Sequence, residues 1–294
     1  MNRNAVVFGA AGQLGVELVR DLGARGYSVQ AWDRAHVDIT DSASVERALA
    51  EHEVEVVFNA AAYNQVDVAE KEPQAAFLVN ALAVRNLAVA CRQSDARLVH
   101  FSTDYVFDGM AGRPYKEDDP THPLGAYAVS KLAGELYAQA YLDKALVVRT
   151  SGVYGLGGLT TARGNFVELM LRLARSRNPI RVVEDHVASP TFAPLLAART
   201  VDLVDAGLSG VFHIAGGTPV SWFDFARAIF EIAGLEPVLQ ATNEREYRTP
   251  ARRPKYSALS NSKVEFCGLA PMPPLRQALE AYFEERRRAT ASPA

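Results

Sequence analysis

Two polar segments carry the residues of this 294-residue chain whose types and spacing suit chemistry. The first, Ser102 to Gly109, reads Ser-Thr-Asp-Tyr-Val-Phe-Asp-Gly and directly follows the apolar run from Arg97 to Phe101. The second holds Tyr127 and Lys131 at the start of a helical pattern. Residues four apart share one face of a helix, so we expect these two side chains to point into the same cleft.

A tyrosine beside a lysine is suited to moving a proton. The free phenol has a pKa of about 10, and a nearby ammonium favours the phenolate and lowers that pKa. A hydroxyl such as that of Thr103 would hold a substrate oxygen beside Tyr127. The set indicates carbonyl–alcohol interconversion, in which hydride from a nicotinamide goes to carbon, Tyr127 protonates oxygen and no metal is needed. For Tyr127 and Lys131 alone, the alternative is an exposed helix start with a solvated lysine.

A glycine-rich turn indicates the matching cofactor site. Gly9, Gly12 and Gly15 form a GxxGxxG pattern between the apolar strand at 5–8 and a helix that follows at once. The first glycine permits the tight turn, the second lets the backbone approach a pyrophosphate, and the third lets the helix pack on the strand. The amino end of that helix then offers free N–H groups to the phosphates.

The choice between NADH and NADPH depends on two neighbouring residues of opposite charge. Asp33 ends the second strand and can accept hydrogen bonds from an adenosine ribose, which favours NAD. Arg34 either meets a 2′-phosphate or is a solvated loop charge. We therefore expect NADH or NADPH as the cofactor, with a slight preference for tolerance of both.

Strands and helices alternate regularly through residue 150, which predicts an α/β fold with a Rossmann-like, doubly wound parallel sheet. The second half is less regular and indicates a small C-terminal substrate-binding lobe near the carboxyl edge of the sheet. We predict a dinucleotide-binding domain over residues 1–150, a lobe over 151–288 that is interleaved with the last elements of the sheet, and a frayed tail over 289–294.

Composition excludes several classes of partner. A net charge of −3 gives no electrostatic footprint for nucleic acid or acidic lipid. Cys91 and Cys267 are the only cysteines, so we expect no disulfide framework and a reducing compartment. The amino terminus lacks the pattern of a signal peptide, and we expect no apolar run of the roughly 20 residues that span a bilayer. The prediction is a cytoplasmic protein with no nucleic-acid or membrane partner.

These motifs together resemble the dTDP-4-dehydrorhamnose reductase family of the extended short-chain dehydrogenase/reductase superfamily. The resemblance covers nearly the whole chain, and its most specific part is the segment from Ser102 to Gly109. The other matching segments are 9–15, 59–63, 66–70, 127–135, 149–151, 164–167, 189–191 and 252–254.

The resemblance implies a role for each matching residue. Tyr127 is the catalytic acid, Lys131 binds the nicotinamide ribose and lowers the tyrosine pKa, and Thr103 orients the sugar carbonyl. The cofactor-binding residues are Gly9, Gly12, Gln13, Leu14, Gly15, Asp33, Asp38, Ile39, Ala62, Tyr63, Asn64, Tyr127 and Lys131. The substrate-binding residues are Thr103, Asp104, Tyr105, Val66, Asp67 and Arg253.

Arg253 is a candidate for pairing with a substrate diphosphate, because a guanidinium forms two parallel hydrogen bonds to phosphate. The alternative is a surface salt bridge. Some members of the family bind magnesium through glutamates at a dimer interface. Glu17 matches one of those positions, but Pro194 stands at another, so we predict no metal site. Whether the chain forms a homodimer stays open.

The resemblance implies NAD(P)H-dependent reduction of the 4-keto group of a dTDP-4-dehydro-6-deoxyhexose, such as dTDP-4-dehydrorhamnose. Gly152 stands where the family usually has a tryptophan that packs against the sugar, so the sugar is uncertain. One alternative is therefore a sugar-nucleotide epimerase or another keto-sugar reductase of the superfamily. A second alternative is a non-catalytic regulatory subunit with this fold, which the intact Tyr127 and Lys131 disfavour.

Overall fold

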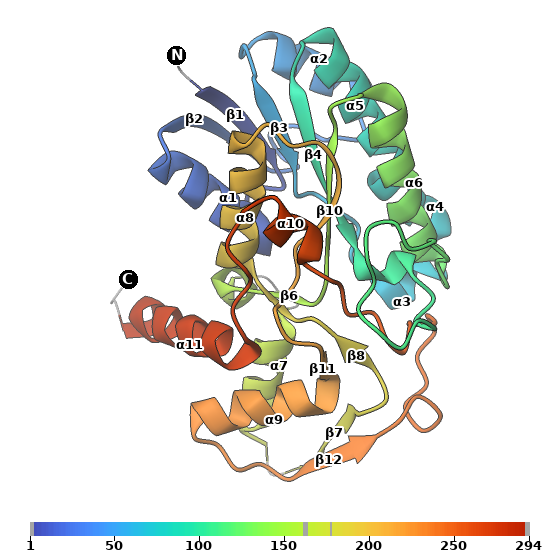
Figure 1. Cartoon of the computed structure of the whole chain (residues 1–294), viewed down its shortest axis with the longest axis vertical. Helices are drawn as coiled ribbons and strands as arrows, with labels where there is room; N and C mark the ends of the chain where they lie inside the picture. Colours follow the sequence, from blue (N-terminus) through green and yellow to red (C-terminus); the bar gives the residue numbers. More distant parts are fainter. Residues whose placement is uncertain (1–2, 161–163, 177, 292–294) are drawn as a thin grey trace.

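Six parallel strands form the central sheet, in the order β10-β5-β4-β3-β1-β2 (Figure 1). The computed structural model describes residues 3–160, 164–176 and 178–291. The strands are short apolar runs, as expected for parallel strands that are buried on both faces. They are β1 (Arg3–Phe8), β2 (Tyr27–Trp32), β3 (Val56–Asn59), β4 (Arg97–Thr103), β5 (Leu146–Thr150) and β10 (Gly210–His213).

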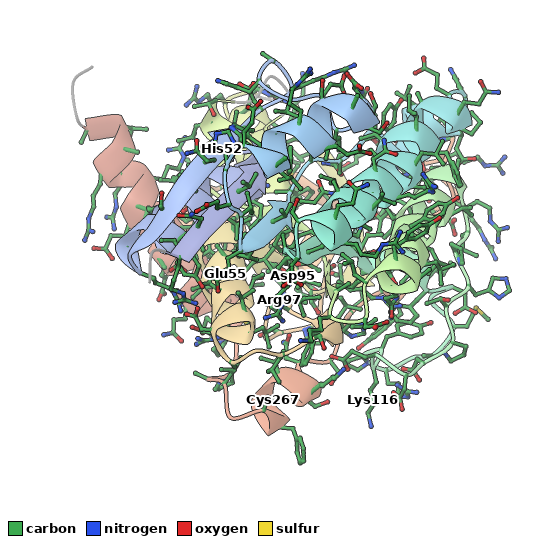
Figure 2. All side chains as sticks on the ribbon, turned by 90° about the horizontal axis from the view of Figure 1, so that it is seen from above. His52, Glu55, Asp95, Arg97, Lys116 and Cys267 are labelled. Carbon is green, nitrogen blue, oxygen red and sulfur yellow. The ribbon has the colours of Figure 1, made fainter. Side chains whose placement is uncertain are left out.

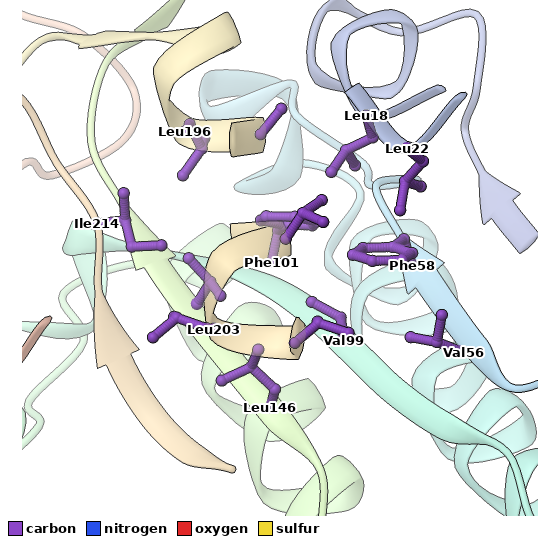
Figure 3. Packing of buried hydrophobic residues seen from close by; sticks show 14 of the residues in the cluster. Leu18, Leu22, Val56, Phe58, Val99, Phe101, Leu146, Leu196, Leu203 and Ile214 are labelled. Carbon is purple, nitrogen blue, oxygen red and sulfur yellow. The ribbon is translucent and has the colours of Figure 1, made fainter. Parts of the chain in front are cut away.

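Helices cover both faces of the sheet, which confirms the predicted α/β fold. One face packs on α1 (Gln13–Ala24) and α8 (Ala193–Asp205), through a core that Figure 3 shows in close view. Leu18 and Leu22 of α1 and Leu196 of α8 point there toward Phe58 and Phe101 of the strands. The other face packs on α2 (Ser42–Ala50), α5 (Ala83–Gln93) and α6 (Ala126–Tyr141). Since β10 and α8 come from the second half of the chain, that half contributes to the sheet as well as to the lobe.

The strand order places a crevice beside β1. The chain continues from β1 to β2 on one side and then crosses to β3 on the other side. In open α/β sheets, ligands bind outside the carboxyl ends of the strands at such a switch point. The loops after β1, β2 and β3 therefore surround the expected cofactor site.

The helix from Pro73 to Gln93 corrects one expectation and contains one irregularity. It is 21 residues long and apolar enough, by length and composition, to cross a membrane, so the expectation of no such segment was wrong. Half of its most apolar stretch is buried, and it packs on the sheet and on α6 as a core helix of this fold. It is also not a regular α-helix throughout, because a π-helical segment, η1 (Leu78–Leu82), separates α4 (Pro73–Phe77) from α5.

The lower half of Figure 1 shows a smaller lobe facing the carboxyl ends of the strands. Its core joins α7 (Phe166–Leu173), α9 (Trp222–Ala233) and α11 (Leu275–Ala291) with β7 (Ile180–Val183), which pairs with β12 (Leu239–Thr242). Because α11 continues to Ala291, residues 289–291 of the expected frayed tail are helical, and residues 292–294 lie outside the described residues. The predicted domain boundaries stay a prediction.

Short elements connect these layers. They are α3 (Val66–Ala69), η2 (Asp104–Val106), β6 (Val153–Tyr154), η3 (Leu156–Leu159), β8 (Val187–Ala188), β9 (Thr191–Phe192), β11 (Val220–Ser221) and α10 (Ser262–Phe266). Figure 2 looks onto the opposite end of the sheet, where Glu55, Asp95 and Arg97 lie at the amino ends of β3 and β4. The polar segments singled out in the sequence lie at the other end, between the sheet and the lobe.

Candidate active site

A groove of about 750 Å³ follows the carboxyl ends of β1, β2 and β3. It is the place where a doubly wound sheet binds a dinucleotide. Eight of the predicted cofactor-binding residues line it, namely Gly9, Gly12, Asp33, Asp38, Ile39, Ala62, Tyr63 and Asn64. The other five predicted residues are not among the described residues that line it. Gln13, Leu14 and Gly15 belong to the first turn of α1, and Tyr127 and Lys131 belong to α6.

The glycine turn leaves room for backbone alone. Gly9 has a φ of +74°, and a Cβ atom on it would lie 2.6 Å from the main-chain nitrogen of Ala61. A Cβ atom on Gly15 would lie 2.1 Å from the carbonyl oxygen of Gly9. Such contacts are too short for any side chain. Gly9 therefore permits the close approach of the loop after β3 to the turn, and Gly15 permits the close packing of α1 on the turn after β1. The residues of the groove therefore fit a dinucleotide.

The residues at the end of β2 form a charged rim on this groove. The Asp33 carboxylate accepts a hydrogen bond from the main-chain N–H of Ala35 at 2.9 Å and lies 2.7 Å from Nδ1 of His36. Arg34 is 84% exposed, and its Nε donates to Asp38 at 3.1 Å. An acidic and a basic side chain thus stand side by side where an adenosine ribose would lie, as the sequence predicts.

Thr103 and Tyr127 reach the same end of the sheet from different elements. Thr103 ends β4, where its hydroxyl accepts a hydrogen bond from the Tyr105 N–H at 3.2 Å and donates one to Asp104 at 3.1 Å. Tyr127 lies in the first turn of α6, whose first N–H, on Ala126, donates to the Glu70 carboxylate at 2.8 Å. The rings of Tyr105 and Tyr127 meet edge to face, with their centroids 6.2 Å apart.

The pKa of Tyr127 lies above its ordinary value, which corrects the lowering expected from the sequence. Burial of the phenol raises this pKa most, the charge of Asp104 raises it further, and a hydrogen bond with Thr103 acts in the opposite direction. Lys131 is not among the groups that shift the pKa of Tyr127. Its ammonium donates instead to the carbonyl oxygen of Phe101 at 2.5 Å. Burial lowers the pKa of Lys131 to about 8.

Asp104 is the centre of a buried group of hydroxyls. The residue is 3% exposed, and its carboxylate accepts hydrogen bonds from Ser151 at 2.8 Å and Ser257 at 2.5 Å as well as from Thr103. Burial raises the pKa of Asp104 to about 6, and these hydrogen bonds limit the rise. Both carboxylate oxygens already have donors within the protein, so Asp104 holds Thr103 in place.

Asn80 connects the cofactor groove to α6, and the sequence did not single it out. It lies in the π-helical segment, where its side chain accepts from the Tyr63 N–H at 2.8 Å and donates to the Tyr63 carbonyl at 3.0 Å. It also donates to the Ser130 hydroxyl at 3.0 Å, next to Lys131. π-Helical turns are frequent at functional sites, which is the signal that could have drawn attention to this residue.

A second pocket, of about 330 Å³, opens between the sheet and the lobe. Asp67, Tyr105 and Arg253 of the predicted substrate-binding residues line it, and Val66 lies beside Asp67 in α3. Sequence reasoning missed the rest of the lining, which is Phe166, Leu169, Met170, Leu173, Arg181, Val182, Val183, His186, Trp222, Glu244, Tyr247, Thr249 and Ala251. This pocket approaches the catalytic candidates through Tyr105, whose ring contacts Tyr127.

Arg253 forms an ion pair across this second pocket. Its guanidinium donates to both carboxylate oxygens of Asp67, at 3.0 and 2.9 Å, and to the Thr249 hydroxyl at 2.6 Å. The salt bridge that the sequence offered as the alternative is therefore present, although within a pocket. Burial tends to lower the pKa of Arg253, but the Asp67 carboxylate outweighs this effect and raises it.

Comparisons with known proteins agree on one family. A family model described as the RmlD substrate binding domain matches residues 3–288. The chain is 43% identical over 280 residues to the dTDP-4-dehydrorhamnose reductase of Mycobacterium tuberculosis, covering 93% of this chain and 90% of the relative. It is 39% identical over 281 residues to the spore coat polysaccharide biosynthesis protein SpsK of Bacillus subtilis, covering 96% and 97%. The chain belongs to the dTDP-4-dehydrorhamnose reductase family.

A solved member of this family shares the fold. The crystal structure of dTDP-4-dehydrorhamnose reductase from Bacillus anthracis, in complex with NADP, superposes with a TM-score of 0.92 at 35% identity. The match covers 97% of this chain and 100% of that one. The predicted class is therefore confirmed: the protein is an NAD(P)-dependent oxidoreductase of the dTDP-sugar reductase family.

Glu17, the glutamate considered in the sequence as a metal ligand, forms an ion pair with an arginine. Arg20 lies 2.7 Å from the Glu17 carboxylate and 3.7 Å from that of Glu285. Pro194 lies in the first turn of α8. Across residues 3–160, 164–176 and 178–291, no three histidine, cysteine, aspartate or glutamate side chains gather so that they could hold a metal ion.

Proposed function

We propose that this protein reduces the 4-keto group of a dTDP-4-dehydro-6-deoxyhexose with NADH or NADPH, and that dTDP-4-dehydrorhamnose is converted to dTDP-L-rhamnose. The observation that carries the proposal is the hydrogen bond between Thr103 at the end of β4 and Tyr127, which lies one helical turn before Lys131 in α6. The ring of Tyr105 connects Tyr127 to the second pocket. Relatives named for this reaction support the choice of substrate.

Tyr127 is the proton donor in this proposal. When bound, NAD(P)H supplies the hydride that reduces the carbonyl carbon, and the Tyr127 hydroxyl gives its proton to the carbonyl oxygen. The Tyr127 phenol is protonated at neutral pH, as a proton donor must be, although its raised pKa makes it a weaker acid than a free phenol. Thr103 positions the oxygen beside the phenol. Lys131 is mostly charged below its pKa of about 8 and would meet the nicotinamide ribose.

The cofactor would lie along the groove, with its pyrophosphate against Gly12, Gln13 and Leu14 at the amino end of α1. The adenosine would lie between Asp33 and Asp38-Ile39. The sugar nucleotide would occupy the second pocket, between α3 and the lobe, where Asp67 and Arg253 supply charged groups. A bound diphosphate would have to share Arg253 with Asp67. The enzyme would act in the cytoplasm.

The test is an assay of the purified protein with dTDP-4-dehydrorhamnose and either reduced cofactor. Loss of the reduced-nicotinamide absorbance with formation of dTDP-L-rhamnose supports the proposal, and no turnover contradicts it. Gly152 favours a second candidate, a reductase or epimerase of a different keto sugar. An epimerase would retain NAD through purification and would interconvert two sugar nucleotides without net oxidation, so the product separates the two functions.

A further inference from the structure

Trp222 is a half-buried aromatic residue of the lobe that lines the second pocket. It is the first residue of α9, and its main-chain N–H donates to the carbonyl oxygen of His186 at 3.2 Å. Its ring packs edge to face on Phe166, with centroids 4.7 Å apart, and lies 6.0 Å from the ring of Phe225. These contacts hold the indole in one position, with part of its surface lining the second pocket.

The far edge of this indole lies over Gly152. A Cβ atom at Gly152 would be 3.3 Å from Cη2 of Trp222 and 3.4 Å from Cα of Pro190. The glycine also has a φ of +51°, a conformation that residues with a side chain rarely adopt. A side chain at this position would therefore strain the backbone and press on the ring, which would have to move by a few tenths of an ångström. Glycine at position 152 allows the indole to lie this close.

The position of Gly152 connects the indole to the reacting end of the site. Ser151 precedes it and donates to Asp104, which in turn accepts from Thr103. Gly152, which the ring edge covers, thus follows in sequence a serine that is bonded to the same carboxylate as Thr103. On the other side, the indole shares its pocket with Tyr105, which contacts Tyr127. A sugar whose carbonyl met Thr103 and Tyr127 would have its ring next to Trp222.

We propose that Trp222 determines sugar specificity, as the apolar wall against which the hexose ring of the substrate packs. The inference rests on the proposed function, because that function places a hexose at this point. The face of a deoxyhexose presents C–H groups and a methyl group, which an aromatic surface covers well. The indole N–H adds one hydrogen-bond donor for a sugar hydroxyl.

The test compares binding of dTDP-L-rhamnose with binding of dTDP, which lacks the sugar. Trp222→Ala should weaken dTDP-L-rhamnose about tenfold or more, a loss of the size expected for one aromatic contact, and should leave dTDP within about twofold. Trp222→Phe keeps an aromatic face, so its affinity for dTDP-L-rhamnose should lie between those of wild type and Trp222→Ala. If the alanine variant does not fold, Trp222→Leu replaces it. Equal weakening of both ligands, or no weakening, would overturn the inference.

Fluorescence offers an independent readout, because Trp32 and Trp222 are the only tryptophans of the chain. In Trp32→Phe, Trp222 is the sole indole, and dTDP-L-rhamnose should change its emission. In Trp222→Phe, where only Trp32 remains, the same ligand should leave the emission unchanged. An unchanged signal in Trp32→Phe would overturn the inference.

Failure of this inference is distinguishable from failure of the proposed function. If the wild-type protein turns over the keto sugar while Trp222→Ala keeps the wild-type KM for it, only the role of Trp222 is wrong. If the wild-type protein binds neither dTDP nor dTDP-L-rhamnose, both are wrong. A raised KM for the sugar nucleotide with an unchanged KM for NADPH supports both.

Discussion

The Thr103 hydroxyl donates a 3.1 Å hydrogen bond to the Asp104 carboxylate, and this bond fixes what Thr103 can offer to its neighbours. A hydroxyl has one proton to give and lone pairs with which to accept. A substrate carbonyl oxygen can only accept hydrogen bonds, so Thr103 can hold it only by turning this proton from Asp104 toward the substrate. The Tyr127 phenol, whose raised pKa leaves it protonated at neutral pH, is the group that gives up a proton to the oxygen.

The buried Asp104 makes stability depend on pH. Its pKa rises from 3.8 to about 6 on folding, so folding favours the protonated form. Its contribution is fully present below the ordinary pKa and is lost as pH rises through about 6. We expect the unfolding free energy of Asp104→Asn, minus that of wild type, to increase by about 2 kcal/mol between pH 4 and pH 7.5. Urea titrations at both pH values measure it, and a difference that is constant with pH would contradict it.

Glu135 of α6 and Arg149 of β5 form a buried ion pair. The two residues are 1% and 5% exposed, their closest atoms are 2.7 Å apart, and Ser102 also donates to Glu135. Removing one partner leaves the other charge buried without compensation. Arg149→Met should therefore lower the unfolding free energy by about 3 to 5 kcal/mol.

The double variant Glu135→Leu/Arg149→Met is the matched control, because it removes both charges at once. It should lose clearly less stability than the single variant, since no buried charge is left. Denaturant unfolding of the two variants and wild type gives the comparison. A double variant less stable than Arg149→Met would show that the attraction between the charges, rather than the cost of an unpaired charge, dominates.

Arg34 and Asp33 should act in opposite directions on cofactor choice. Arg34 is exposed and bonded only to Asp38 among the described residues, so it is able to turn to a 2′-phosphate. Arg34→Ala should reduce kcat/KM with NADPH by about five- to tenfold and leave NADH nearly unchanged. Asp33→Asn should reduce kcat/KM with NADH more than with NADPH. Equal effects on both cofactors in either variant would refute the assignment.

Local patterns in the sequence were enough to predict the sheet, the glycine turn and the catalytic candidates. Tyr127 and Lys131 lie in one helix, and Thr103 is the last residue of a buried strand, so spacing alone brings them to the carboxyl end of the sheet. Long-range packing was not accessible in this way. Trp222 and Gly152 are 70 positions apart in the chain, and only the folded lobe brings them together.

The direction of the Tyr127 pKa shift also needed the structure. Sequence reasoning placed Lys131 one helical turn away and counted its charge, which lowers a phenol pKa. The fold adds the burial of the phenol and the nearby Asp104 charge, and both act in the opposite direction. It also directs the Lys131 ammonium toward the Phe101 carbonyl. Asn80 was missed for a similar reason, because its contacts to Tyr63 and Ser130 depend on a π-helical turn.

The most direct test of the central claim is the rate at which Tyr127→Phe oxidises NADPH in the presence of dTDP-4-dehydrorhamnose, measured beside wild type. The variant lacks only the hydroxyl that is assigned as the proton donor. We predict turnover by wild type and a rate lower by about 10²- to 10⁴-fold in the variant, with dTDP-L-rhamnose bound equally well by both. A variant that keeps the wild-type rate would contradict the assignment of Tyr127.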